Sequence, residues 1–179
     1  MDTYKLDFTI LELEIFTYLS IRTGEMFSQR DIAKALKVSP TAVSNAIKNL
    51  TIKDLVKLNK TKTINFISFN RDNHKAIELK KVENLKQIYI SGFSDFLEEK
   101  LAGSTIILFG SYSRGEDTKT SDIDIAIIGR KEKTLSLEKF EKTLNRKINL
   151  NFYDSLRGIH KHLKNNILNG IIIHGSVEL

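Results

Sequence analysis

The spacing of hydrophobic residues changes along the chain and divides it into three parts. Residues 1–72 show helical spacing in three segments and then two short alternating runs, which predicts three helices and a hairpin. Residues 73–103 keep a helical period, which predicts a connecting helix with a break near Ser91 and Gly92. Residues 104–179 alternate short apolar strands with helices, one of them around residues 155–168, which predicts a mixed α/β sheet domain. The predicted fold class of the whole chain is therefore α+β.

The helices of residues 1–72 carry clear start signals. A capping box pairs a Ser or Thr with an acid three positions later, and proline favours the first position of a helix. In the first helix, we expect the buried apolar face to consist of Ile10, Leu13, Ile15, Phe16 and Leu19. The hairpin is predicted from the strand-like runs 55–58 and 64–69, which a polar tip joins. The start signals are Thr9 with Glu12, Ser28 with Asp31, and Ser39 with Pro40.

The turn over residues 36–39 joins two short helices, and this spacing gives the proportions of a helix-turn-helix. The second helix would be the recognition helix, because it exposes small polar and amide side chains that fit into a major groove. With the hairpin as a wing, residues 1–72 resemble winged-helix transcription regulators. The candidate DNA-contacting residues are Thr41, Ser44, Asn45, Lys48, Lys60 and Lys62.

Charge favours double-stranded DNA as the partner of this part. The chain has 28 Lys and Arg against 22 Asp and Glu, a net charge of +6. Residues 37–62 alone contain six lysines and one acid, a net charge of +5. Lysine contacts to phosphates supply most of the affinity that does not depend on base sequence. The alternative interpretation is a three-helix protein-interaction module with a solvated lysine face.

Composition excludes several other classes of protein. The chain has no cysteine, which excludes a disulfide scaffold, a thiolate zinc site and a cysteine nucleophile. The first 30 residues contain no charged segment followed by an apolar run, so no signal peptide is expected. No apolar run approaches the roughly 20 residues that a membrane span needs. We therefore expect a cytoplasmic protein without a membrane partner.

A glycine–serine pair and two aspartates form the second group of candidate residues. Gly110 and Ser111 follow one apolar strand, and Asp122 and Asp124 begin the next. A glycine lets the backbone approach a ligand, and N–H groups at a helix start, with a serine hydroxyl, bind phosphate oxygens. Aspartates two positions apart on a strand point to the same face and can hold one or two Mg²⁺ ions. The residues between, Asp117 among them, are expected to form a solvated turn.

The sequence of this segment is GSYSRGEDTKTSDIDIAII, and it resembles minimal nucleotidyltransferases of the DNA polymerase β-like superfamily. The resemblance implies transfer of a nucleoside monophosphate, often AMP, from ATP or another nucleoside triphosphate to a hydroxyl group. It places Mg²⁺ at Asp122 and Asp124, and the nucleotide at Gly110, Ser111 and Arg114. The matching residues are Gly110, Ser111, Arg114, Gly115, Ser121, Asp122 and Asp124.

The family pattern implies a third carboxylate on the following strand, and here the chain departs from it. In the predicted strand 147–153, side chains alternate between two faces, and Asn149 takes the position of the expected acid. An amide oxygen can ligate Mg²⁺, but it adds no negative charge and cannot act as a base. Asp154 is an alternative third carboxylate if the strand contains a bulge.

Three hypotheses about function follow. The first is a DNA-binding protein with a Mg²⁺-dependent nucleotidyltransferase domain that transfers AMP to a protein or another acceptor, with Asp122, Asp124 and Asn149 as catalytic residues. The second is a transcription regulator whose degenerate domain only binds or senses nucleotide, and the third is a structural interaction module. The predicted domains are a winged helix-turn-helix over 1–72, a helical connector over 73–103 that is also a candidate homodimer contact, and a minimal nucleotidyltransferase over 104–179.

Overall fold

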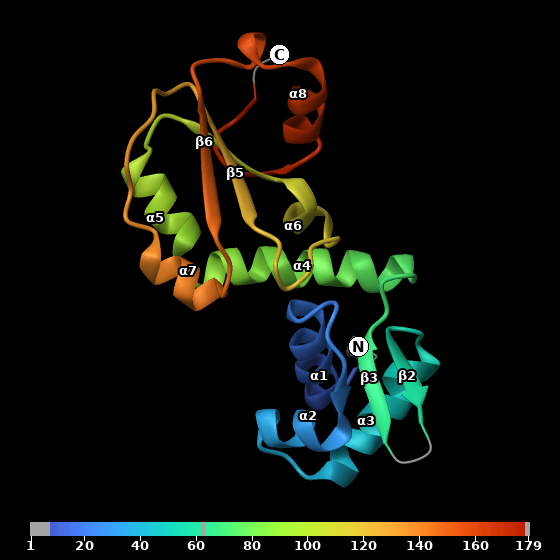
Figure 1. Ribbon diagram of the computed structural model, residues 1–179. Helices are drawn as coiled ribbons and strands as arrows, with labels where there is room; N and C mark the ends of the chain where they lie inside the picture. Colours follow the sequence, from blue (N-terminus) through green and yellow to red (C-terminus); the bar gives the residue numbers. More distant parts are fainter. Residues whose placement is uncertain (1–7, 62–63, 178–179) are drawn as a thin grey trace, which may run out of the picture. The chain divides into compact units, whose positions relative to one another are not determined.

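The computed structural model describes residues 8–61 and 64–177, and the chain separates into two compact units, Met1–Lys80 and Lys81–Leu179 (Figure 1). The division falls within helix α4 (His74–Ile90), and helix α5 (Phe93–Lys100) follows after the predicted break. Within the described parts of the chain, no helix is both long enough and apolar enough to cross a membrane. The predicted domain limits at residues 72 and 103 stay predictions.

In the first unit, three helices accompany a small antiparallel sheet. The strand order is β1-β3-β2, so that β3 pairs with both neighbours. This topology is that of a winged helix-turn-helix, with α2 and α3 as the helix pair and the β2–β3 hairpin as the wing. The hydrophobic pattern does not predict β1, because a two-residue strand has no alternation to recognise. The elements are α1 (Ile10–Ile21), β1 (Phe27–Ser28), α2 (Gln29–Leu36), α3 (Pro40–Ile52), β2 (Val56–Lys60) and β3 (Asn65–Phe69).

The three predicted helix starts are confirmed. Thr9 and Ser28 each accept a hydrogen bond from the backbone of the acid three positions later, and that acid accepts one from the backbone of the cap in return. Ser39 accepts from the backbone of Ala42 and precedes a proline at the first helical position. These bonds satisfy N–H groups that have no acceptor inside the helix. The hydrogen bonds from Ser28 also hold the pKa of the Asp31 carboxyl below its ordinary value.

The expected buried face of α1 is wrong at its start. Ile10 is 78% exposed and Leu13 is 38% exposed, whereas Glu12 is only 3% exposed. Glu12 is buried without loss because its carboxylate accepts hydrogen bonds from the Thr9 backbone (2.8 Å) and from Asn49 Nδ2 (2.7 Å). The inward positions recur at three- and four-residue intervals, which leaves Ile10 outside the stripe. They are Glu12, Ile15, Phe16 and Leu19.

The second unit is built on a four-stranded mixed sheet. The strand order is β6-β5-β4-β7, in which β5 and β6 are parallel and the other pairs are antiparallel. This confirms the predicted α+β class with a mixed C-terminal sheet. The further elements are β4 (Thr105–Phe109), α6 (Gly110–Arg114), β5 (Ile123–Ile128), α7 (Glu138–Leu144), β6 (Ile148–Tyr153), α8 (Lys161–Leu168) and β7 (Ile171–His174).

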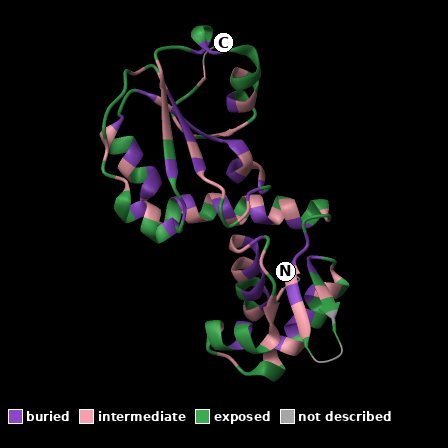
Figure 2. Cartoon of the chain, viewed as in Figure 1, coloured by how far each residue is buried: buried purple, intermediate pink, exposed green. Residues whose placement is uncertain are grey.

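The residues of β4 and β5 alternate between two separate cores, one on each face of the sheet. Figure 2 colours the buried residues purple. On one face, Leu108 and Ile125 pack with Phe93 of α5 and Phe140 of α7. The opposite face packs against the segment from residue 156 to the end of α8. Because both faces are covered, the strand carries apolar residues along most of its length. Its carboxylates, Asp122 and Asp124, lie at the start of β5. The two cores therefore place Asp122 and Asp124 at one end of the sheet.

The helix predicted around residues 155–168 is shorter than expected. A 3₁₀ turn spans Leu156–Gly158, and α8 begins only at Lys161. Ile159 (φ −86°, ψ 132°) and His160 (φ −55°, ψ 138°) have extended backbones, which interrupt the helix. Ile159 is buried in the core beneath α8, so tertiary packing overrides the local helical pattern.

Candidate active site and nucleic-acid interface

The structure brings Asp122, Asp124 and Asn149 together. Asp124 is the second residue of β5, and the parallel register pairs it with Asn149 of β6. Asn149 Nδ2 donates hydrogen bonds to Asp122 Oδ2 (3.2 Å) and to Asp124 Oδ1 (3.1 Å). Since carboxylates only accept hydrogen bonds, the amide must turn its nitrogen toward them. The three side chains thus form one polar cluster at the start of β5.

Gly110, the first residue of α6 directly after β4, lies next to this cluster. Its φ of +78° lies in the left-handed region, which side chains disfavour. A Cβ at this position would lie 2.7 Å from Asp124 Oδ2, so any other residue would displace the Asp124 side chain. Ser111 follows in the short helix α6 and is half-buried. The backbone of Gly110 therefore lies against Asp124, on the side of β5 opposite to Asn149.

The other residues of the signature have structural partners. Arg114 Nε forms an ion pair with Glu116 Oε2 (2.8 Å), and its Nη1 donates to Asn166 Oδ1 on α8 (2.9 Å). Ser121 Oγ accepts a hydrogen bond from the Thr118 backbone (2.9 Å) and so shapes the turn before Asp122. In this structure Arg114 links α6 to α8 and does not contact the aspartates.

Asp154 lies away from the cluster. The pairing of β5 with β6 is continuous from Ile123 with Ile148 to Ile128 with Tyr153, without a bulge. Asp154 follows the last of these residues, at the far end of β6 from Asn149. A strand rises about 3.3 Å per residue, so five residues separate the two side chains by roughly 16 Å. The alternative third carboxylate is therefore not supported by the register.

A buried ionic cluster beside the site was not expected from the sequence. Asp117, predicted to lie in a solvated turn, is fully buried, and its Oδ2 lies 3.5 Å from Arg146 Nη2. Asn84 Nδ2 of α4 donates to Asp117 Oδ1 (2.7 Å) and to the Tyr112 carbonyl (2.9 Å). Burial, and then the charge of Asp117, raise the pKa of the Tyr112 phenol. No spacing signal could have found this cluster, because the hydrogen bonds that join its members span 28 residues or more.

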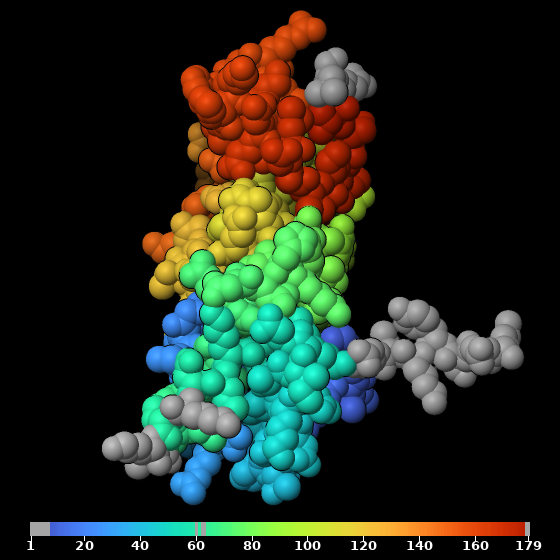
Figure 3. All heavy atoms as spheres, turned by 90° about the vertical axis from the view of Figure 1, so that its right-hand side faces the viewer, coloured from blue at the N-terminus to red at the C-terminus, as the bar shows by residue number. Residues whose placement is uncertain are grey.

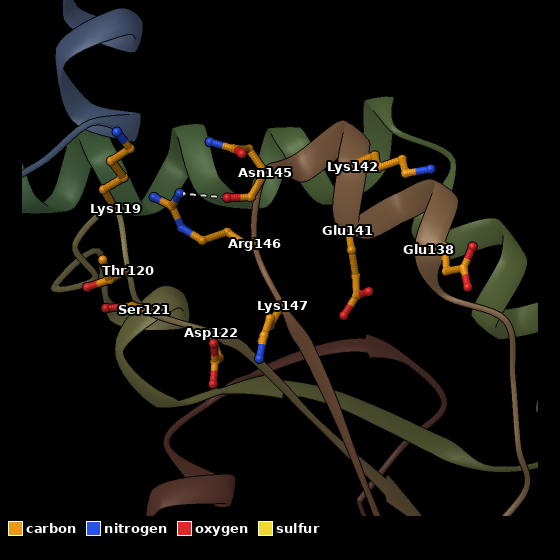
Figure 4. A pocket seen from close by; sticks show the side chains of 10 residues that line it. All are labelled: Lys119, Thr120, Ser121, Asp122, Glu138, Glu141, Lys142, Asn145, Arg146 and Lys147. Carbon is orange, nitrogen blue, oxygen red and sulfur yellow. Dashed lines mark hydrogen bonds between the residues drawn. The ribbon is translucent and has the colours of Figure 1, made fainter.

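A pocket of about 600 Å³ opens beside Asp122 (Figure 4). Its walls come from the turn before β5, from α7 and from the residues that precede β6. Figure 4 shows Lys147 and Asp122 extending to the same side of the pocket, with Glu141 opposite. Glu141 Oε1 accepts a hydrogen bond from the Ile148 backbone (3.0 Å), which fixes the start of β6 to α7. Of the three residues in the cluster, Asp122 lines this pocket.

The residues present fit a divalent ion with a reduced ligand set. Two carboxylates lie within hydrogen-bond reach of one amide nitrogen, so their oxygens are close enough to share a ligand. Mg²⁺ prefers oxygen ligands and needs only one or two carboxylates when phosphates supply the rest. Among residues 8–61 and 64–177, no group of three or more Asp, Glu or His side chains is placed to hold a metal. Asp122 and Asp124 are the residues of this cluster that could hold such an ion.

The recognition helix α3 presents its candidate DNA contacts on one face. Thr41, Asn45 and Lys48 are exposed at three- and four-residue spacing, and Ser44 is half-buried. The light blue and cyan spheres of Figure 3 show α3 and β2 forming part of the surface of the first unit. Lys60 is the last residue of β2, and Lys62 lies outside the described residues.

Two polar residues near this face have partners inside the unit. Asn49, which the helical spacing places outward, is bonded through its side chain to Glu12 of α1. Lys57 of β2 forms an ion pair with Asp72, and the hydrogen bond from Lys57 lowers the pKa of the Asp72 carboxyl. Lys57 therefore already has an acidic partner within the first unit.

The comparisons with known proteins bear on both units. Residues 90–174 match the nucleotidyltransferase domain family, which supports the resemblance stated for that part of the chain. The solved structure of a cysteine-to-serine mutant of ZitR from Lactococcus lactis is 21% identical with a TM-score of 0.42, over 57% of this chain and 68% of that chain. No curated protein matches the chain.

Two further solved structures show a similar degree of likeness. The adhesin competence repressor AdcR from Streptococcus pyogenes is 21% identical with a TM-score of 0.41, over 54% of this chain and 69% of that chain. The S. aureus MepR–DNA complex is 23% identical with a TM-score of 0.39, over 54% of this chain and 80% of that chain. These TM-scores are low, and the winged helix of the first unit is defined by its own order of elements.

Proposed function

We propose that this chain is a DNA-binding protein whose second unit binds a nucleoside triphosphate, ATP in our expectation, together with Mg²⁺. The observation that carries the proposal is the meeting of Asp122 and Asp124 with Asn149, beside the close approach of Gly110. It lies in the segment that matches the nucleotidyltransferase domain family. Asp122 and Asp124 would hold the metal, and the backbone at Gly110 and Ser111 would face the phosphates.

The reaction that such a site serves is transfer of a nucleoside monophosphate to a hydroxyl group. The hydroxyl oxygen forms a bond to the α-phosphorus, the bond to the β-phosphate oxygen breaks, and pyrophosphate leaves. When bound, Mg²⁺ would neutralise charge that develops on the phosphates. The acceptor, a protein or another molecule with a hydroxyl, must also lose a proton. Asn149 cannot take this proton, because a neutral amide is not a base.

A second candidate function is a transcription regulator that binds or senses nucleotide without turnover. The amide of Asn149, bonded to both aspartates, favours this candidate. With an acid there, the site would gain a third negative charge and a group able to accept the acceptor's proton. With the amide, we expect transfer to be slow or absent while nucleotide binding remains.

Calorimetric titration of the full chain with Mg·ATP tests nucleotide binding. Asp122→Asn and Asp124→Asn should each abolish Mg²⁺-dependent binding, because each removes a charged metal ligand. Their melting temperatures should stay level or rise, since two carboxylates held close repel each other. Asp154→Asn, at the far end of β6, is the matched control and should bind as wild type does. Wild-type affinity in both site variants would show that these aspartates do not bind the metal.

Asn149→Asp separates the two candidate functions. It restores a base and a third charge, and general-base help is typically worth about 10²–10⁴-fold in rate. We expect an AMP adduct to form faster in the variant than in wild type. Mass spectrometry of the two proteins after incubation with Mg·ATP, with and without cell lysate as a source of acceptors, is the measurement. Rapid transfer by wild type that the variant leaves unchanged would return the chain to the active-enzyme hypothesis.

For the first unit, the proposal rests on the exposed polar face of α3 and on the local charge of +5 over residues 37–62. Both are what phosphate and base contacts in a major groove require.

Homodimerisation through residues 73–103 also stays a proposal. In this region Val82, Tyr89 and Ile90 of α4 are 62%, 46% and 68% exposed, which is unusual for large apolar side chains on one helix.

A further inference from the structure

The nitrogen of the Asn149 side chain occupies the space between the two aspartates. It lies 3.2 Å from an Asp122 oxygen and 3.1 Å from an Asp124 oxygen, so both of its N–H groups point at carboxylates. Two carboxylates that share a site repel each other unless a positive or hydrogen-donating group lies between them. The amide supplies that group from within the chain. A cation that bridges the two carboxylates would compete for the same space.

We infer that Asn149 takes the place of one of two metal ions, so that the site accepts a single divalent ion with each nucleotide. The inference rests on the proposed function, because it concerns the metal that accompanies the nucleotide at Asp122 and Asp124. It assigns Asn149 the role of a built-in neutral bridge between the aspartates. A site of this kind binds nucleotide but lacks the second ion that activates an attacking hydroxyl in two-metal transfer.

The backbone of Asn149 is held in place, so the amide cannot simply withdraw. Its register with Asp124 is set by an uninterrupted parallel pairing of six residues. Ile148 beside it is buried in the core on the other face, and its backbone N–H is bonded to Glu141. The side chain can rotate so that its amide oxygen faces a metal ion, but that oxygen is neutral and can fill only one ligand position.

The charge of the site also favours one ion. Asp122 and Asp124 together supply two negative charges, which balance one divalent ion. Among the described residues, no third acid joins the two aspartates in a group placed to hold a metal, so a second ion would lack a carboxylate of its own there. Lys147 lines the same pocket as Asp122 and adds a positive charge on the open side. Asn149→Asp would change both features, because it removes the donor and adds a third carboxylate.

Counting bound Mn²⁺ tests the inference directly. Mn²⁺ replaces Mg²⁺ in oxygen-ligand sites and reports its bound fraction by electron paramagnetic resonance. The full chain is titrated with Mn²⁺ in the presence of the α,β-methylene analogue of ATP, which cannot transfer AMP. We expect one Mn²⁺ per bound nucleotide for wild type and two for Asn149→Asp. Asn151→Asp adds the same charge two residues along the same face of β6 and should still bind one.

The possible outcomes are distinguishable. Two Mn²⁺ per nucleotide in wild type would overturn the inference while leaving the proposed function intact. One ion in both wild type and Asn149→Asp would also overturn it, because the side chain at 149 would then not set the number. No bound Mn²⁺ with the nucleotide analogue would overturn the proposed function together with the inference.

A thermal measurement keeps the inference testable if Asn149→Asp folds poorly. Asn149→Ala removes the amide bridge without adding charge. Without metal, its melting temperature should fall below that of wild type, because the two carboxylates lose their shared donor. Addition of Mn²⁺ should then raise its melting temperature by more than it raises that of wild type. Equal shifts in the two proteins would contradict a bridging role for Asn149.

Discussion

At the scale of single residues, Gly110 has the strictest requirement in the candidate site. Its backbone is left-handed, and a Cβ there would meet Asp124 Oδ2 at 2.7 Å. Gly110→Ala should therefore lower the free energy of unfolding by about 1–2 kcal/mol from the backbone alone. It should also weaken Mg·ATP binding at least tenfold, because Asp124 must move. Urea denaturation and calorimetric titration measure the two effects.

Gly129→Ala is the matched control for this prediction. Gly129 follows β5 with a φ of +88°, and nothing lies within 4 Å of the Cβ that an alanine would bring. Gly129→Ala should lower the free energy of unfolding by a similar amount, because its backbone is also left-handed, and should keep wild-type affinity for Mg·ATP. If Gly110→Ala bound nucleotide as tightly as Gly129→Ala does, the close approach to Asp124 would have no role in binding.

Part of the candidate site could be proposed from sequence because its pattern is local. Two aspartates at alternate positions must share a face. Alternation along β6 puts Asn149, Asn151 and Tyr153 on one face, and the family resemblance selects Asn149 among them. What alternation cannot give is the side chain's partner, and the bridge from Asn149 to both aspartates is visible only in three dimensions. Asp117 shows the opposite case. Its polar neighbours in sequence indicate a solvated turn, but in the interior it is bonded to Asn84 and Arg146, which are distant in sequence.

At the scale of elements, the Asp117–Arg146 pair ties together the two segments that lead into the site. Asp117 lies five residues before Asp122, and Arg146 lies three residues before Asn149. Arg146→Met should lower the free energy of unfolding by about 3–5 kcal/mol, because it leaves the charge of Asp117 buried. In the double variant Asp117→Asn with Arg146→Met, the charge is gone and Asn84 keeps an acceptor at residue 117. Most of the loss should then be recovered.

A double-mutant cycle compares the free energies of unfolding of four proteins, measured by urea denaturation. They are the wild type, Asp117→Asn, Arg146→Met and the double variant. We expect a strongly non-additive result, with a coupling free energy of at least about 1 kcal/mol. If the two losses were simply additive, the pair would be no more than two independent buried groups. The positions of β5 and β6 would then not depend on it.

Element boundaries were predictable where a local interaction fixes them. Caps at Thr9, Ser28 and Ser39 set three helix starts, and the glycine at 92 separates α4 from α5. Boundaries set by tertiary packing were not predictable. The break before α8 exists because Ile159 packs under the helix, and β1 exists only through its pairing with β3.

At the scale of the whole molecule, charge is concentrated where the fold places a recognition helix and a wing. The chain has a net charge of +6, and residues 37–62 account for +5. The surfaces of the two units differ: one presents an exposed polar helix flanked by lysine-rich segments, the other a carboxylate cluster with Asp122 beside a pocket. The α+β class and the order of the two parts followed from hydrophobic periods alone, since periods of about 3.6 and 2 are strong over long segments.

The concentration of positive charge predicts how the full chain binds DNA. Each phosphate contact should contribute a slope of about −0.9 to the dependence of log K on log salt concentration. Lys48→Ala, on the exposed face of α3, should weaken binding to all duplexes alike and reduce the slope by about one contact. Lys60→Ala in the wing should act in the same way. Lys161→Ala, an exposed lysine on α8, is the control and should change neither quantity.

Asn45→Ala should behave differently from the lysine variants. An amide at an exposed position of a recognition helix can read a base edge, and one good bidentate contact is worth about 1–3 kcal/mol of discrimination. The variant should therefore narrow the difference in affinity between a duplex selected for tight binding and one of random sequence, while its salt slope stays unchanged. Fluorescence anisotropy with both duplexes, at about 50 to 200 mM salt, measures the two quantities together. Absence of binding to either duplex at the lowest salt would remove DNA as the partner of the first unit and favour a protein-interaction module in its place.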